Sequence, residues 1–113
     1  MTPEPSETIE RVLVAAALVP VGQVVSYGDL AGLVGTSARR VGTIMSRYGS
    51  GVPWWRVTSA AGQLPVDLLG RAKEHWADEG IEVAASGRGC RIGCYRADLV
   101  ALAEAYVRET GGD

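Results

Sequence analysis

Apolar and polar positions at the start of the chain follow a helical repeat. Ser6 is a favoured N-cap residue, and Glu7 and Glu10 complement the positive end of a helix dipole. Pro20 disfavours a helical conformation at the residue before it. The pattern therefore predicts a helix that follows a disordered lead-in of residues 1–5, is capped by Ser6, and has one apolar face formed by Ile9, Leu13, Ala16 and Ala17.

Two short helices are predicted next. Ser26-Tyr27-Gly28-Asp29 matches a capping box with aspartate in the usual glutamate position, and the helix that it opens ends at Gly35. Thr36 or Ser37 then caps a second helix, which runs from residue 38 to about residue 47. This is the helix-turn-helix pattern, although any two short helices joined by glycine would match it. The apolar residues available to pack the pair are Leu30, Leu33, Val41, Ile44 and Met45.

The second of these helices has little side-chain bulk on one face. Ala38 and Gly42 are four residues apart and share that face, and Arg39 lies beside it. The helix offers no Asn, Gln or Lys to read base edges in a DNA groove. So smooth a helix suits close approach to a nucleic-acid backbone or a shallow groove, and it would equally suit tight packing against another helix.

A helix and a hairpin are predicted after an irregular stretch, residues 58–67. The apolar face of this helix is formed by Leu69, Ala72 and Trp76. Gly80 ends it, and residues 81–83 and 90–92 then flank a glycine-rich turn that is consistent with a small hairpin or wing.

The chain is predicted to end in a helix over residues 98–110 that Asp98 caps. Its apolar face is formed by Leu99, Leu102, Ala103 and Tyr106. Because there is no internal repeat and no break in composition, the 113 residues are read as one domain, 1–113. The predicted fold class is mainly α with a small β-hairpin (α+β), similar to a winged helix-turn-helix.

Composition excludes several kinds of protein. The longest apolar run, residues 12–19, is too short to cross a bilayer, and the N-terminus lacks the basic region of a signal peptide. We therefore expect a cytoplasmic protein that does not act at membranes. Cys90 and Cys94 have the spacing of neither a redox pair nor a zinc site, and His75 is the only histidine. We expect buried, inert thiols, no metal, no cofactor and no histidine-based catalytic centre.

Positive charge is concentrated in one segment of an acidic chain. Between residues 20 and 58 the charged residues are Arg39, Arg40, Arg47, Arg56 and Asp29, a local charge of +3. Because the net charge is −2, the rest of the chain carries −5. The arginines indicate either a phosphate-binding face or an ordinary solvated surface.

The most distinctive segment is Val52-Pro53-Trp54-Trp55-Arg56-Val57. Two adjacent tryptophans among glycine and proline indicate the wall of a pocket formed by a shaped loop. They could equally be core residues that are buried for their area. The six residues alone favour neither interpretation.

Two longer motifs carry a family resemblance. Val-Pro-Val-Gly-Gln-Val-Val-Ser-Tyr-Gly-Asp-Leu-Ala at residues 19–31, followed by Ala-Arg-Arg-Val-Gly-Thr-Ile-Met at residues 38–45, resembles the DNA-binding domain of O6-alkylguanine-DNA alkyltransferases. Those enzymes continue into Pro-Cys-His-Arg-Val, whose cysteine accepts the alkyl group, where this chain has residues 53–57. Tryptophan in place of the cysteine is typical of the alkyltransferase-like proteins. The resemblance covers about residues 9–83.

The resemblance implies roles for individual residues. Tyr27 would help to rotate the target nucleotide out of the duplex, and Arg39 would fill the gap left in the base stack. The lesion pocket would be formed by Tyr27, Met45, Trp54 and Val57. DNA would be contacted by Ser26, Tyr27, Ser37, Ala38, Arg39, Arg40, Gly42 and Arg47. Structural roles would fall to Pro53, Arg56 and Glu79.

Two departures from the family pattern bear on chemistry. In the enzymes a histidine activates the cysteine, because only a thiolate attacks readily. Trp55 stands in the place of that histidine, so Glu79 has no proton relay left to support. Residues 63–67 do not match the tyrosine–serine lid of the enzymes' pocket.

The resemblance therefore implies a non-enzymatic DNA-damage sensor that flips O6-alkylguanine into a pocket and flags it for nucleotide excision repair. Its partners would be double-stranded DNA that contains O6-alkylguanine and excision-repair proteins. We expect a monomer that associates with the nucleoid when bound to DNA. The alternative is a winged-helix regulator or adaptor without a base pocket. An enzyme that uses Cys90 or Cys94 as the acceptor is disfavoured because both are far along the chain from the pocket motif.

Overall fold

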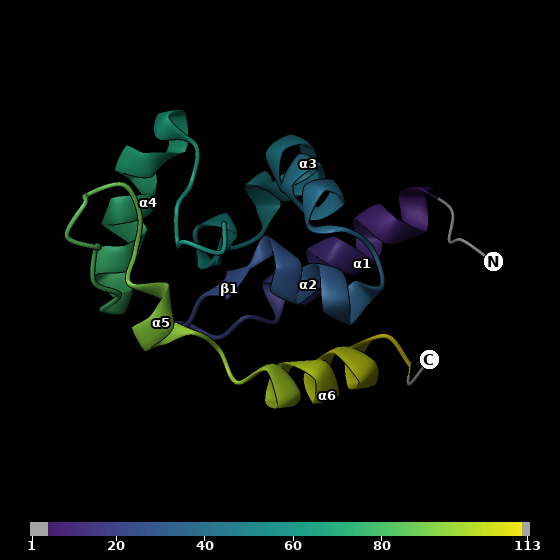
Figure 1. Cartoon of the computed structure of the whole chain (residues 1–113). Coiled ribbons are helices and arrows are strands. Elements are labelled where there is room, and N and C mark those ends of the chain that lie inside the picture. The colour runs from purple at the N-terminus through teal and green to yellow at the C-terminus, as the bar shows by residue number, and fades with distance from the viewer. Residues whose placement is uncertain (1–4, 112–113) are drawn as a thin grey trace.

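Helices account for most of the fold (Figure 1). The structure is a computed structural model that describes residues 5–111. Its elements in chain order are α1 (Pro5–Ala17), β1 (Val25–Ser26), α2 (Tyr27–Val34), α3 (Ala38–Tyr48), the 3-10 helices η1 (Gly49–Gly51) and η2 (Trp54–Arg56), β2 (Val57–Thr58), α4 (Val66–Glu79), α5 (Ile92–Tyr95) and α6 (Leu99–Glu109). This confirms the mainly helical class with a small β component. No helix among residues 5–111 is long and apolar enough to span a membrane.

Helix α1 begins earlier than predicted. Pro5 lies in its first turn, where the missing N–H would have had no helical partner, so Ser6 is not the N-cap. Residues 1–4 of the predicted lead-in lie outside the described part of the chain. The apolar face is also rotated from the predicted one, because Val12 and Ala15 are fully buried whereas Ala17 is exposed.

The caps predicted for α2 and α3 are confirmed. The Ser26 side chain accepts a hydrogen bond from the Asp29 N–H at 3.1 Å, and the Asp29 carboxylate accepts one from the Ser26 N–H at 2.9 Å. Gly35 ends α2 in the left-handed region, at φ +89°. Ser37, not Thr36, caps α3 by accepting from the Arg40 N–H.

The sheet joins two segments that are far apart in the sequence. β1 pairs in parallel with β2, with Val25 opposite Val57. Beside them, the Val24 N–H donates to the Tyr95 carbonyl and the Ala97 N–H donates to the Val24 carbonyl, both at 2.9 Å. These pairings bring the start of α2 next to the Trp54–Arg56 turn.

The predicted hairpin is reduced to one antiparallel bridge, between Val83 and Cys90. Ile92 begins α5 instead of continuing a strand. The irregular stretch is also shorter than predicted, because β2 includes Thr58 and α4 begins at Val66. Gly80 ends α4 as predicted, in the left-handed region.

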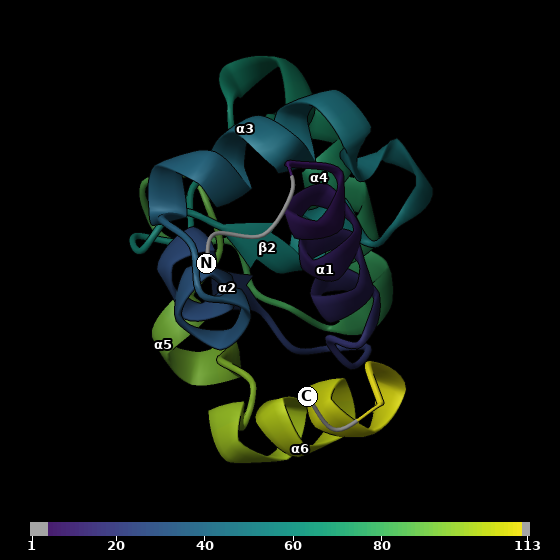
Figure 2. The ribbon, with the colours of Figure 1, turned by 90° about the vertical axis from the view of Figure 1, so that its right-hand side faces the viewer.

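Two hydrophobic clusters form the core. The first cluster joins α1, α2, α3 and α6. Helix α6 lies below α1 and α2 in Figures 1 and 2. The second cluster lies around α4 and contains Val24, Leu64, Ala72, Trp76, Ile81 and Cys90. Trp54 packs against both, so the tryptophan turn lies where the two clusters meet.

Candidate functional site

The two tryptophans of η2 face different surroundings. Their rings meet edge to face, with centroids 5.6 Å apart and planes at 87°. The Trp55 ring is turned toward α4, where the His75 ring stacks on it at 3.6 Å with the planes within 5°. The Trp54 ring is turned toward a cavity instead. A short hydrogen bond, 2.7 Å, from the main-chain N–H of Trp54 to the Val52 carbonyl helps to form this turn around Pro53.

A buried ion pair holds η2 against α4. The Glu79 carboxylate accepts hydrogen bonds from the Gly22 N–H (2.9 Å), the Trp55 Nε1–H (2.7 Å) and the Arg56 Nε–H and Nη2–H (2.9 and 2.7 Å). The side chains of Arg56 and Glu79 are only 12% and 9% exposed. Burial alone would raise the pKa of Glu79, but the hydrogen bonds from Arg56, Gly22 and Trp55 outweigh it and hold the pKa below its ordinary value. Glu79 is therefore an ionised structural anchor.

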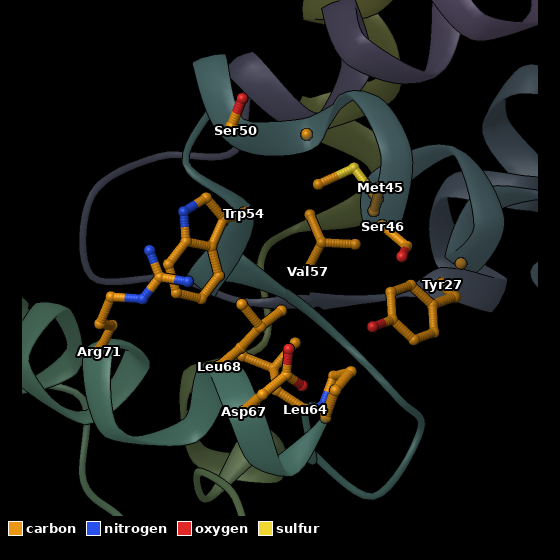
Figure 3. A pocket seen from close by; sticks show the side chains of 13 residues that line it. Tyr27, Met45, Ser46, Ser50, Trp54, Val57, Leu64, Asp67, Leu68 and Arg71 are labelled. Carbon is orange, nitrogen blue, oxygen red and sulfur yellow. The ribbon is translucent and has the colours of Figure 1, made fainter.

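A cavity of about 290 Å³ opens between α3 and the first turns of α4 (Figure 3). All four residues of the predicted lesion pocket, Tyr27, Met45, Trp54 and Val57, line it. Helix α3 supplies the wall with Gly42, Met45 and Ser46, and Gly49 follows from η1. Burial raises the pKa of the Tyr27 phenol, whose hydroxyl points into the cavity in Figure 3. The phenol is therefore a neutral hydrogen-bonding group at physiological pH.

The opposite wall was missed by the sequence analysis. It consists of Leu64, Pro65, Asp67, Leu68 and Arg71. The Arg71 guanidinium carbon lies 5.6 Å from the centroid of the Trp54 ring, and Figure 3 shows the two side by side. Helical spacing alone places 67, 68 and 71 on one face of α4. Nothing in the sequence indicates that this face adjoins α3, however.

The smooth face of α3 is not covered by another helix. Ala38 is exposed, and a Cβ added at Gly42 would meet only the Tyr27 ring, at 3.9 Å. Arg39 and Arg47 are also exposed, and neither forms an ion pair with any residue of the described chain. The structure therefore favours an open, positively charged surface beside the cavity over the alternative of tight helix packing.

The remaining residues of the predicted DNA contact set differ in their accessibility. Ser37 is exposed at the start of α3, and Arg40 is half-buried. Ser26 is buried, and its N–H and hydroxyl oxygen both serve the capping box. The structure thus gives Ser26 a helix-capping role, and its contact with DNA stays a prediction.

Neither cysteine lines the cavity. Cys90 is buried as predicted, and burial raises the pKa of its thiol to about 11, which keeps it protonated. The prediction of a buried thiol is wrong for Cys94, which α5 leaves exposed. Among residues 5–111 no cluster of His, Cys, Asp and Glu could hold a metal ion.

Comparison with known proteins identifies relatives of known kind. Residues 7–81 match the family model described as 6-O-methylguanine DNA methyltransferase, DNA binding domain. The DNA base-flipping proteins of Escherichia coli K12 and Shigella flexneri are each 36% identical over 85 residues. That match covers 70% of this chain and 66% of each relative's length, so the chain spans slightly less than two thirds of these relatives.

Two crystal structures share the fold. One is S. pombe Atl1 in complex with damaged DNA containing O6-carboxymethylguanine, with a TM-score of 0.72. The other is S. pombe ATL in complex with DNA, with a TM-score of 0.70. Both are 28% identical to this chain, and the match covers 87% of it and 99% of each solved chain. The chain belongs to the family of the 6-O-methylguanine-DNA methyltransferase DNA-binding domain, as an alkyltransferase-like member.

Proposed function

We propose that this protein is a non-enzymatic sensor of DNA damage that rotates O6-alkylguanine out of duplex DNA and holds it beside Trp54. One observation carries the proposal: Tyr27, Met45, Trp54 and Val57 converge on a single cavity next to the exposed arginines of α3. The relatives support it, because they include DNA base-flipping proteins and Atl1 bound to DNA with O6-carboxymethylguanine.

The energetics of base rotation agree with this arrangement. Extruding a base costs a few kcal/mol of stacking and pairing, and less when the base is damaged. Contact with an aromatic side chain such as Trp54 recovers roughly 1–3 kcal/mol. Arg39, exposed on α3, would fill the vacated place in the base stack. The guanidinium of Arg71 lies beside the Trp54 ring on the α4 wall of the cavity.

Neither cysteine of the chain lines the pocket, so the proposal assigns no thiol as an acceptor for the alkyl group. Trp54 is not a nucleophile, and Trp55 donates its N–H to Glu79 in place of a relay. We therefore expect that incubation with labelled O6-methylguanine DNA transfers no label, and that Trp54→Cys stays nearly inactive for want of an activating histidine. Mass spectrometry that finds stoichiometrically alkylated protein would contradict the sensor proposal.

Because no reaction removes the alkyl group, the complex persists and marks the lesion. We propose that nucleotide-excision-repair proteins then recognise it, and that the protein acts as a monomer in the cytoplasm, associated with the nucleoid when bound to DNA.

The decisive experiment is competition binding with two duplexes that differ only by one O6-methylguanine. The lesion duplex should displace a labelled probe at lower concentration than its undamaged match. Equal competition by the two duplexes would favour a winged-helix regulator or adaptor that does not use the cavity.

A further inference from the structure

The single histidine of the chain lies against both tryptophans of η2. His75 is half-buried on α4, and its ring stacks on Trp55 at 3.6 Å. It also meets Trp54 edge to face, with centroids 5.7 Å apart and planes at 83°. The three rings therefore form a continuous cluster at the wall of the cavity.

Within that cluster, hydrogen bonds fix Trp55 but not the ring of Trp54. The Trp55 N–H donates to Glu79, and its carbonyl accepts from the Trp76 Nε1–H, both at 2.7 Å. Among the described residues, the indole N–H of Trp54 has no hydrogen-bond partner. The orientation of the Trp54 ring is consequently set by packing, and its ring contacts are the edge contacts with Trp55 and His75 and the Arg71 guanidinium beside it.

We propose that His75 is a positioning residue for Trp54. Together with Trp55 it forms a rigid aromatic platform that holds the Trp54 ring in the orientation in which it lines the cavity. Aromatic contacts depend on the angle between the rings, so a platform of this kind fixes an orientation that aliphatic packing would not. The inference rests on the proposed function, since it assumes that a flipped base contacts the Trp54 ring.

His75→Leu tests the proposal because leucine keeps apolar volume and removes the ring. The ratio of affinities for O6-methylguanine duplex and undamaged duplex should fall by up to about tenfold, because the energy of one aromatic pair limits what the orientation of Trp54 can contribute. Affinity for undamaged duplex should be retained. His75→Phe, which keeps a ring that can stack, should restore the ratio. Glu74→Ala, at an exposed neighbouring position of α4, should leave it unchanged.

A spectroscopic readout reports the surroundings of the Trp54 ring without DNA. With 5-fluorotryptophan incorporated, the fluorine signal of Trp54 should shift in His75→Leu and return toward its original position in His75→Phe. An unchanged Trp54 signal and an unchanged affinity ratio in His75→Leu would overturn the positioning role. An equal loss of affinity for both duplexes, with a lower unfolding midpoint, would also overturn it by showing a purely structural role. If the wild-type protein itself does not discriminate between the duplexes, the proposed function fails instead.

Discussion

The two hydrophobic clusters on either side of the cavity are held together by different kinds of interaction. The first cluster is mainly aliphatic, with Val12, Leu30 and Ile44 fully buried, and local caps fix the ends of its helices α2 and α3. The second cluster is built around one large side chain, Trp76. It depends on polar bonds between distant segments, of which the Arg56–Glu79 pair is the most extensive.

This difference matters for the cavity, because each cluster supports one wall. Helix α3 belongs to the first cluster, and α4 belongs to the second. Among the described residues, Trp54 alone packs against both. The distance between the two walls of the cavity therefore depends on the contacts that join the second cluster to the first. Substitutions inside a cluster should mainly change the free energy of unfolding, whereas substitutions at the cavity should mainly change DNA binding.

The largest effect is expected from Trp76→Ala. Trp76 is fully buried, and the substitution leaves a large cavity and an unpaired Trp55 carbonyl, so the free energy of unfolding should fall by about 3–5 kcal/mol. Ile44→Val in the first cluster should cost only about 0.5–1.5 kcal/mol. Urea unfolding of the two variants measures both values. A loss below 1 kcal/mol for Trp76→Ala would show that the second cluster contributes little to folding.

Glu79→Gln should come next. It leaves the Arg56 guanidinium buried without its counter-charge, and we expect a loss of about 3 kcal/mol of unfolding free energy. The pKa of Glu79 is lowered by folding, so its stabilisation is present above the unfolded value of about 4.3 and is lost as pH falls through the lower folded pKa. As the pH is lowered from neutral to about 3, the midpoint temperature of thermal unfolding should therefore fall less steeply for Glu79→Gln than for the wild type.

Asp29→Asn is the control for that measurement. Burial alone would raise the pKa of Asp29, but its bonds with Arg96 and Ser26 outweigh burial and lower it. Asp29 consequently accounts for part of the acid sensitivity that Glu79→Gln retains. Identical acid profiles for the wild type and Glu79→Gln would show that Glu79 is not the group that titrates.

Trp54→Ala tests where the clusters meet. The ring is only half-buried and lines the cavity, so the variant should fold and lose roughly 1–3 kcal/mol of binding to lesion duplex. With 5-fluorotryptophan incorporated, the fluorine signal of Trp54 should respond to lesion duplex more than to undamaged duplex. A folded Trp54→Ala protein with unchanged lesion affinity would refute the pocket assignment.

The smallest effects are expected on the exposed face of α3. Arg47→Ala should weaken binding to all duplexes alike and lower the salt slope by about one, as loss of one phosphate contact does. Arg39→Ala should lose lesion preference more than general affinity, because in the proposed mechanism Arg39 acts only once a base has left the stack. An equal loss on damaged and undamaged DNA would make Arg39 a plain phosphate contact.

The first cluster could be predicted from sequence largely because its signals are local. The capping box at Ser26 and the helix end at Gly35 each involve residues within a few positions of one another. The face of α1 was predicted wrongly at Ala17, because alanine marks an apolar face only weakly when Val12 and Ala15 offer a competing one.

The second cluster and its pocket wall depend on contacts that no local pattern encodes. The hydrogen bond from Trp76 to Trp55, the stack of His75 on Trp55 and the place of Arg71 beside Trp54 each join residues well separated in sequence. The pocket residues Tyr27, Met45, Trp54 and Val57 were predicted from the family resemblance, which carries long-range information that the spacing of residues lacks. Asp67 lies in the stretch 63–67, which does not match the lid of the enzymes' pocket, and Arg71 follows that stretch.

The main chain of Val24 has a consequence for engineering. Val24 is completely buried, and both of its peptide groups bond to residues 95 and 97, beyond the family-matched stretch that ends at Ile81. A fragment cut after residue 81 would lose both of these partners, together with the side chains of Cys90, Ile92 and Tyr95 that pack in the same cluster as Val24. The packed unit of this protein therefore extends beyond the matched stretch, through residue 97 and into α6, whose Leu102 and Tyr106 are buried in the first cluster. A graft of α2 and α3 onto another scaffold would therefore also need the segment that contains residues 95 and 97.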